Sequence, residues 1–163
     1  MINSAYEMIA LVDSQVKTIA DPIVRSFLQS LLVRPIKQQR EWGYETAPNE
    51  TFLCWLVLEH TMSDTGIAYS ELGYGPSQPW GLVFLSKLII GDDSGWFSTL
   101  ERAFYDSYAA GDLKIWNLVK KVNGEIAEVI EEGVTLDAAY GKRDKLKLDP
   151  STYAVEHRTF PAK

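Results

Sequence analysis

The stretch from Thr51 to Leu58 (TFLCWLVL) decides the fold of this chain. It is almost entirely apolar and contains the strand-favouring residues Phe52, Trp55 and Val57. It is much shorter than the roughly 18 apolar residues of a membrane helix, and turn-forming residues follow it in Thr61 to Gly66 (TMSDTG). We therefore expect a central strand of a β-sheet.

Further strands are expected on the C-terminal side of this run. Ile67 to Leu72 (IAYSEL) predicts a second strand, and Leu82 to Leu85 (LVFL) predicts the start of a third. The preferred interpretation continues this strand into Ile89–Ile90, and the alternative is a helical turn. The block between the second and third strands, Gly73 to Leu82 (GYGPSQPWGL), combines glycines, which permit unusual backbone angles, with prolines, which fix φ and lack a donor. We expect a rigid loop that holds its aromatic residues in set positions.

Two helices are expected before the sheet. Ser4 and Glu7 have the spacing of a capping box, in which two side chains satisfy free amides of the first turn. Asp21 followed by Pro22 predicts the start of a second helix, because aspartate caps helices and proline is favoured at the first helical position. Pro35 is expected to end that helix.

An amphipathic helix and a smaller unit are expected after the sheet. Trp96, Leu100, Phe104 and Tyr108 recur every four residues, which predicts a helix that covers the sheet. Asn123-Gly124 then separates two strand-like runs and predicts a hairpin, with a helix and a last strand beyond it. The predicted class is α+β: two N-terminal helices, a mainly antiparallel sheet, one covering amphipathic helix and a C-terminal ββαβ unit.

The domain organisation follows from length and composition. The chain has 163 residues, 46% hydrophobic and 23% charged, which is typical of a globular domain. We expect residues 1–163 to form a single α+β domain. A weak internal boundary is expected near Gly111, so that residues 112–163 form the ββαβ unit.

Charge and targeting signals argue against several classes of function. The formal net charge of −6 and the pI of about 4.9 disfavour nucleic-acid binding and docking on anionic lipid. The N-terminus lacks the basic segment of a signal peptide, and no apolar run is long enough to span a membrane. We therefore expect a cytoplasmic protein with no nucleic-acid or membrane partner.

Candidate catalytic residues are few. Cys54 is the chain's one cysteine and lies in the apolar run, where burial would raise the pKa of its thiol. His60 ends that run, about 20 Å from Cys54 on a straight strand, which is too far for a Cys-His pair. Glu59, Asp64 and Glu71 could join His60 in a cleft for general acid-base chemistry. A small hydrolase or ligand-binding enzyme built on these residues is the alternative to a binding protein.

Metal and cofactor sites are not indicated by any motif. Asp92 and Asp93 lack the regular ladder of a calcium loop, and capping of the following helix accounts for both. The sequence has no P-loop, dinucleotide-binding glycine motif or nucleophile elbow. We therefore expect neither a metal nor a cofactor.

Aromatic and acidic residues gather around two glycine-rich turns. Aromatic side chains dominate binding hot spots, and acidic side chains attract a basic partner and speed the encounter. The alternative is that the aromatic residues pack beneath the loop as core. The predicted partner-binding surface comprises Tyr69, Glu71, Tyr74, Trp80, Asp92, Asp93 and Trp96.

The central part of the chain also resembles a known class of proteins. The segments that carry the resemblance are Cys54-Trp55, Thr65 to Tyr69 (TGIAY), Gly73 to Pro76 (GYGP), Pro79 to Leu82 (PWGL) and Asp93 to Phe97 (DSGWF). Over residues 40 to 108 they are similar to small bacterial immunity-type proteins, cytoplasmic partners that neutralise toxins of contact-dependent or polymorphic toxin systems. The resemblance implies a binding protein without catalysis, whose acidic, aromatic face covers a basic toxin surface.

The sequence therefore favours a non-enzymatic, cytoplasmic protein-binding module of immunity type over an enzyme. Its expected partner is a basic protein. A third alternative is a homo-oligomeric structural protein that uses the aromatic loop as its own contact.

Overall fold

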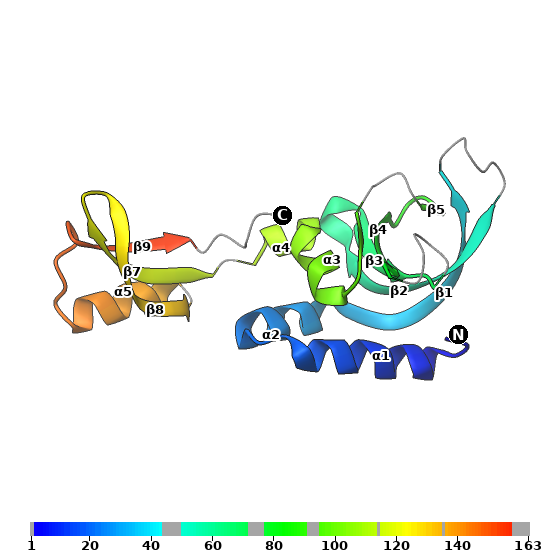
Figure 1. Ribbon diagram of the computed structural model, residues 1–163, viewed down its shortest axis with the longest axis horizontal. Coiled ribbons are helices and arrows are strands. Elements are labelled where there is room, and N and C mark those ends of the chain that lie inside the picture. The colour runs from blue at the N-terminus through cyan, green and yellow to red at the C-terminus, as the bar shows by residue number, and fades with distance from the viewer. Residues whose placement is uncertain are drawn as a thin grey trace. The chain divides into compact units, whose positions relative to one another are not determined.

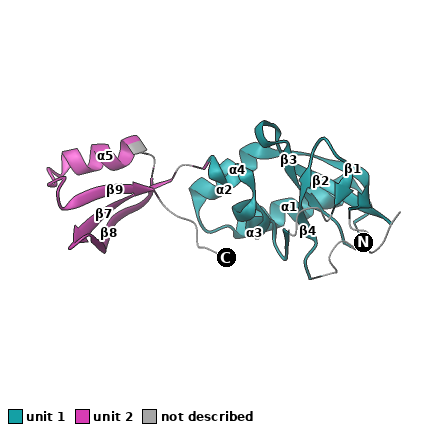
Figure 2. Cartoon of the chain, turned by 90° about the horizontal axis from the view of Figure 1, so that it is seen from above, with its two compact units in different colours: residues 1–112 teal, residues 113–163 magenta. Residues whose placement is uncertain are grey.

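A computed structural model describes residues 2–43, 50–71, 77–90, 95–113, 115–134 and 136–157. The chain divides into two compact units, residues 1–112 and residues 113–163 (Figures 1 and 2). Each unit has its own sheet, so the C-terminal strands do not join the main sheet. The protein is α+β, as the sequence predicted.

The first unit combines helices with a six-stranded sheet. Its described elements in chain order are α1 (Ala5–Thr18), α2 (Pro22–Leu31), β1 (Leu32–Trp42), β2 (Thr51–His60), the short 3-10 helix η1 (Thr61–Ser63), β3 (Thr65–Tyr69), β4 (Trp80–Phe84), β5 (Ile89–Ile90), β6 (Trp96–Phe97), α3 (Leu100–Asp106) and α4 (Tyr108–Gly111).

The starts of both N-terminal helices follow local signals in the sequence. The Ser4 hydroxyl accepts a hydrogen bond from the Glu7 amide (3.2 Å), and the Glu7 carboxylate accepts one from the Ser4 amide (3.2 Å). This reciprocal pair confirms the predicted capping box. Asp21 caps α2 by accepting from the Ile23 amide at 2.9 Å, and Pro22 follows as the first helical residue, as expected.

The second helix ends earlier than predicted. α2 ends at Leu31 and β1 begins at the next residue, so the prediction that Pro35 ends the helix is wrong. Pro35 lies inside β1, where the pairing with β2 shifts register between Leu32 and Ile36. Proline has no amide to donate, and a strand irregularity is a place where that donor is not needed.

The main sheet has the strand order β5-β1-β2-β3-β4-β6. β2 lies in the interior of this order, which confirms the central strand predicted for Thr51 to Leu58. Neighbouring strands pair antiparallel, except that β1 and β5 are parallel. β1 curves strongly, so the sheet bends around one of its faces (Figure 1).

The third predicted strand is shorter than expected. β4 ends at Phe84, and Ile89–Ile90 form the separate strand β5 beside β1, so the expected continuation is wrong. Asp64 holds the turn that separates them. Its main-chain oxygen accepts from the Leu85 amide at 2.9 Å, and its carboxylate accepts from the Ser86 amide at 3.1 Å.

The amphipathic helix predicted from Trp96 also begins later. Trp96–Phe97 form β6, which pairs with β4, and α3 begins at Leu100. The Thr99 hydroxyl caps α3 by accepting an amide of its first turn at 3.2 Å. Thr99 is thus the N-cap of α3, and Asp92 and Asp93, which were predicted to cap this helix, lie outside the described part of the chain.

Buried side chains lie on both faces of the main sheet. One cluster joins the central strands to the edge strands through Cys54, Leu56, Ala68, Val83, Ile90 and Trp96. Helix α1 packs against β1, α2 against β2, and α3 against β3, β4 and β6. Figure 1 shows α1 and α2 along the convex side of the curved sheet. The most completely buried helix residues include Met8, Val24, Leu28, Leu100 and Phe104.

The second unit contains β7 (Trp116–Val122), β8 (Glu125–Val134), α5 (Leu136–Lys145) and β9 (Tyr153–His157), with the strand order β8-β7-β9. Asn123 and Gly124 both have positive φ, 56° and 86°, as a two-residue hairpin turn of type I′ requires. This confirms the predicted hairpin and the ββαβ order. α5 contacts all three strands and lies on one side of them (Figure 2).

Candidate functional site

Two of the predicted partner-binding residues are core residues. Trp80 has no exposed surface, and Trp96 is 5% exposed. Trp80 lies between Tyr69 of β3 and Phe97 of β6 in the cross-strand register, and its ring meets the Tyr69 ring edge-on at 5.0 Å. These placements match the packing alternative, in which the aromatic residues support the sheet.

Tyr69 and Glu71, the two other described residues of the predicted surface, are only partly exposed. Tyr69 is half-buried, and burial together with the nearby charge of Glu71 raises the pKa of its hydroxyl. The Glu71 carboxylate accepts a hydrogen bond from the Ile2 amide at 2.6 Å. Tyr74, Asp92 and Asp93 lie outside the described residues. The described part of the chain therefore does not assemble the surface that the sequence predicted.

The residues of the enzyme alternative are also separated. Asp64 binds Ser86 through the amide and the hydroxyl, and Glu71 binds the N-terminal segment. Among the described residues, the polar partners of the His60 ring are Ser63 and Asp112 rather than the carboxylates of this alternative. A different carboxylate, that of Asp112, reaches His60 from the far end of the first unit. His60 and Asp112 are 52 residues apart in the sequence, so no local pattern predicts that they interact.

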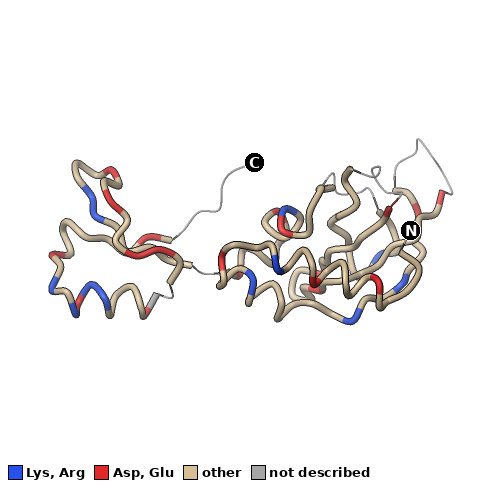
Figure 3. Tube along the Cα trace, turned by 60° about the horizontal axis from the view of Figure 1, so that its bottom comes forward, with Lys and Arg blue, Asp and Glu red and all other residues tan. Residues whose placement is uncertain are grey.

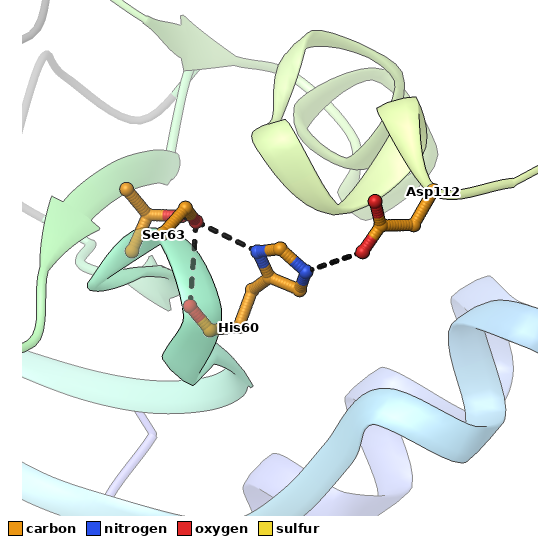
Figure 4. Close-up of polar contacts among 4 residues, drawn as sticks. His60, Ser63 and Asp112 are labelled. Atoms are coloured by element: carbon orange, nitrogen blue, oxygen red, sulfur yellow. Dashed lines mark hydrogen bonds and ion pairs between the residues drawn. The ribbon is translucent and has the colours of Figure 1, made fainter.

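His60 links η1 to the end of α4 (Figure 4). Its Nε2 lies 2.7 Å from the Asp112 Oδ2, and its Nδ1 lies 2.7 Å from the Ser63 Oγ. The Ser63 Oγ lies a further 2.7 Å from the Thr65 Oγ1. The His60 side chain is 12% exposed and that of Asp112 is 56% exposed, so the chain of polar groups runs from the interior to the surface.

The Asp112 carboxylate decides which group donates in the hydrogen-bonded series Asp112–His60–Ser63–Thr65. An ionised carboxylate only accepts hydrogen bonds, so the bond to Asp112 places a proton on the His60 Nε2. The Ser63 hydroxyl has one proton and two acceptors within reach, the unprotonated His60 Nδ1 at 2.7 Å and the His60 carbonyl oxygen at 3.3 Å. The shorter distance favours donation to Nδ1. The Thr65 hydroxyl donates to Ser63 in turn. Every member of this network has a partner, so it fixes η1 against α4.

Two large side chains on the helices that this network joins are exposed. Met62, in η1, is 90% exposed, and Tyr108, the first residue of α4, is 69% exposed. The sequence pattern marks neither of them as a site residue. The helical spacing of Tyr108 from Phe104 predicts a buried position, but the helix breaks at Ser107 between α3 and α4, and Tyr108 is exposed. We use the name η1–α4 surface for His60, Met62, Ser63, Tyr108 and Asp112.

A cavity of about 70 Å³ lies at this end of the first unit. Its walls are formed by Thr65, Leu82, Val83, Phe84, Ser107 and Tyr108. Three of the lining residues carry hydroxyls. Thr65 bonds to Ser63, the Ser107 hydroxyl donates to the Phe104 carbonyl at 2.7 Å, and Tyr108 carries the third on its aromatic ring. Leu82, Val83 and Phe84 are apolar. Thr65 and Tyr108 connect the cavity to the η1–α4 surface.

The acidic charge of the chain belongs to the first unit. Residues 1–112 contain 14 of the 22 Asp and Glu residues and 7 of the 16 Lys and Arg residues, a formal net charge of −7. Residues 113–163 contain the remaining 8 and 9, a net charge of +1. Figure 3 shows how these charges are distributed along the trace. Acidic residues within or next to the η1–α4 surface are Glu59, Asp64, Asp106 and Asp112.

Arg40, one of the seven Lys and Arg residues of the first unit, lies in its interior. Arg40 is fully buried, and its Nη1 donates to the carbonyls of Phe84 (2.9 Å) and Lys87 (2.8 Å). Burial lowers the pKa of this guanidinium from its usual range. Burial raises the pKa of the neighbouring Cys54 thiol to about 11, which keeps it protonated and unreactive. Arg40 and Cys54 are therefore structural groups.

Comparisons and searches for other kinds of site add no further assignment. Among the described residues, no group of three or more His, Cys, Asp and Glu side chains is placed to hold a metal ion. Over the same part of the chain, no helix is both long enough and apolar enough to cross a membrane. No protein-family model, curated protein or solved structure matches this chain.

Proposed function

We propose that this chain is a non-enzymatic protein-binding module of immunity type, which binds a partner with a basic surface through the η1–α4 surface. A cytoplasmic location belongs to the same proposal. One observation carries it: Met62 and Tyr108 are 90% and 69% exposed on η1 and α4, the two short helices that the His60–Asp112 contact joins. Large exposed side chains held on a fixed backbone are typical anchors of protein interfaces.

Electrostatics support a basic partner. The first unit carries a net charge of −7, and its fully buried Arg40 contributes no positive group to the surface. An acidic surface attracts a cationic partner over about one Debye length, roughly 8 Å at physiological salt, and raises the association rate. The contact itself would depend on the two apolar anchors, because exposed ion pairs each contribute about 0–1 kcal/mol.

The network behind the surface supports rigid recognition. His60 bonds to both η1 and Asp112, so the segments that present Met62 and Tyr108 are joined before any partner arrives. A surface that is already ordered loses less conformational entropy on binding. The Asp112 carboxylate keeps 56% of its surface exposed and remains available to a lysine or arginine of the partner.

The test is affinity capture with matched tyrosine variants. The tagged chain, the double variant Met62→Ser/Tyr108→Ser and the control Tyr6→Ser are each exposed to lysate of the source cell, and captured proteins are quantified by mass spectrometry. Tyr6 is 81% exposed on α1, away from η1 and α4 in the chain, so it controls for loss of an exposed tyrosine.

The expected result is a basic protein captured by the unmodified chain and by Tyr6→Ser, but lost from the double variant. Loss of about 2 kcal/mol at a single anchor corresponds to about 30-fold in affinity. Equal capture by all three chains would contradict the assignment of this surface. Solution mass measured on the purified chain separates the homo-oligomer alternative, which predicts a stable dimer or larger assembly without a partner.

A second candidate function, acyl transfer by Ser63, is favoured by the hydrogen-bonded series Asp112–His60–Ser63. With Nε2–H donated to Asp112, the free lone pair on Nδ1 would take the Ser63 proton as the hydroxyl attacks an ester carbonyl. The imidazolium would then give that proton to the departing alcohol as the ester C–O bond breaks, which leaves an acyl-serine for hydrolysis. The cavity walls do not include Ser63 or His60, and about 70 Å³ holds only a few heavy atoms. We therefore rank this function below protein binding.

A fluorophosphonate probe tests this second candidate directly, because it labels activated serines. Labelling of the unmodified chain that is lost in Ser63→Ala and in Asp112→Asn, but kept in the control Ser86→Ala, would establish a nucleophilic serine. Absence of labelling would exclude it. This result is independent of the capture experiment, so the two functions are decided separately.

A further inference from the structure

We propose that the 70 Å³ cavity is an anchor pocket that takes one small branched aliphatic side chain from a basic segment of the partner. The inference rests on the proposed function and names the chemistry of the partner at the same site. The cavity lies next to the η1–α4 surface, since Tyr108 belongs to both and Thr65 bonds to Ser63.

The walls of the cavity favour an apolar occupant over water. A trapped water needs two to four polar partners, but the Thr65 and Ser107 hydroxyls already bond to Ser63 and to the Phe104 carbonyl. The other lining residues are the apolar Leu82, Val83 and Phe84, together with Tyr108, which offers an aromatic ring and one hydroxyl. Water in this space is poorly held, so its replacement by an aliphatic group is favourable.

The size of the cavity selects among apolar side chains. An apolar cavity of about 150 Å³ holds a benzene ring, and one water takes about 30 Å³ of liquid volume. A space of about 70 Å³ therefore admits two or three methyl-sized groups. The tip of valine or isoleucine fits this volume, whereas a phenylalanine ring does not.

The charge of the first unit selects the residues on either side of the inserted side chain, because this unit carries a net charge of −7. Asp64 and Asp106 directly precede the lining residues Thr65 and Ser107 in the sequence, and the half-exposed Asp112 follows α4. A cation is also present, since the Lys87 ammonium lies 5.2 Å from the centre of the Phe84 ring. Lysine and arginine residues on both sides of the inserted side chain would meet these carboxylates. A second copy of this acidic unit would be repelled.

The test uses three synthetic peptides of sequence Lys-Arg-Lys-X-Lys-Arg-Lys, with X as valine, serine or phenylalanine. Binding is followed by NMR titration of the unmodified chain, which does not depend on any variant folding. Burial of one valine side chain predicts about 10-fold tighter binding of the valine peptide than of the serine peptide. The phenylalanine peptide is expected to bind no better than the serine peptide.

Two variants of Ser107 test whether the preference for the valine peptide arises in the cavity. Ser107→Leu fills the space, and Ser107→Ala removes the same hydroxyl while leaving the space open. The valine preference should be retained in Ser107→Ala and lost in Ser107→Leu. Binding without any preference for valine, or a preference that survives Ser107→Leu, would overturn the anchor pocket while leaving the basic partner in place. Failure of all three peptides to bind would overturn the proposed function and the pocket with it.

Discussion

Arg40 offers the sharpest test of how the first unit is held together. The side chain is fully buried in β1, and the perturbation is Arg40→Met, which keeps an unbranched apolar stem and removes the guanidinium. Its Nη1 donates to the carbonyls of Phe84, Lys87 and Ile89, and its Nε and Nη2 donate to the Gln38 side chain. The guanidinium therefore fastens the segment between β4 and β5 to the strand β1.

The magnitude follows from what the substitution leaves behind. Each buried carbonyl that loses its donor costs about 1–3 kcal/mol. Removal of a buried charge recovers part of its desolvation cost, which offsets some of this loss. We expect a net loss of about 3 kcal/mol in the free energy of unfolding, a large part of the 5–15 kcal/mol that stabilises a typical domain.

Urea unfolding followed by tryptophan fluorescence is the assay. Four of the five tryptophans lie in the first unit, so the signal reports mainly on the unit that contains Arg40. With a slope near 2 kcal/mol per molar urea, the midpoint should fall by about 1.5 M. The control Arg34→Met changes an exposed arginine of the same strand and should shift the midpoint by less than about 0.3 M. Equal, small shifts in both variants would refute the role assigned to Arg40.

Three further outcomes are expected. A Cβ at residue 81 would lie 2.8 Å from the Trp96 ring, so Gly81→Ala should lower the free energy of unfolding by about 2 kcal/mol in urea. A Cβ at residue 124 would meet no atom within 4 Å, so Gly124→Ala should lower the free energy of unfolding by only about 1 kcal/mol, because of its φ of 86°. Equal losses in Gly81→Ala and Gly124→Ala would contradict this contrast. The Cys54 thiol, with a pKa of about 11, should resist iodoacetamide at pH 8 until urea is added, and rapid labelling of the folded chain would argue against its burial. Folding raises the pKa of the Cys54 thiol from 9.0 to about 11. The protonated thiol therefore contributes its full stability to the folded state below pH 9, and this contribution is lost as the pH rises toward 11. Urea unfolding at several pH values across this range measures the loss.

Local signals in the sequence predicted local structure well. The capping pair Ser4 and Glu7 and the turn Asn123-Gly124 form as expected, because each depends only on residues next to it in the chain. The central strand β2 was predictable because Thr51 to Leu58 is too short and too apolar for any exposed element. These features also fixed the α+β class.

Features that depend on distant contacts were not predictable in this way. The helical spacing of Trp96 and Leu100 is real, but pairing with β4 makes Trp96 a strand residue and places Leu100 in a separate helix. Burial of Trp80 depends on its cross-strand neighbours, which its own sequence does not reveal. The same holds for the site, because Asp112 reaches His60 only after the whole first unit has folded.

The most direct measurement for the central claim is the affinity of the captured basic partner for two single variants, Tyr108→Ser and Tyr6→Ser. The purified proteins are compared by calorimetry at one salt concentration, with circular dichroism as the check on folding. Binding through the η1–α4 surface predicts about 30-fold weaker affinity for Tyr108→Ser and unchanged affinity for Tyr6→Ser. Unchanged affinity for Tyr108→Ser, or a greater loss for Tyr6→Ser, would contradict it.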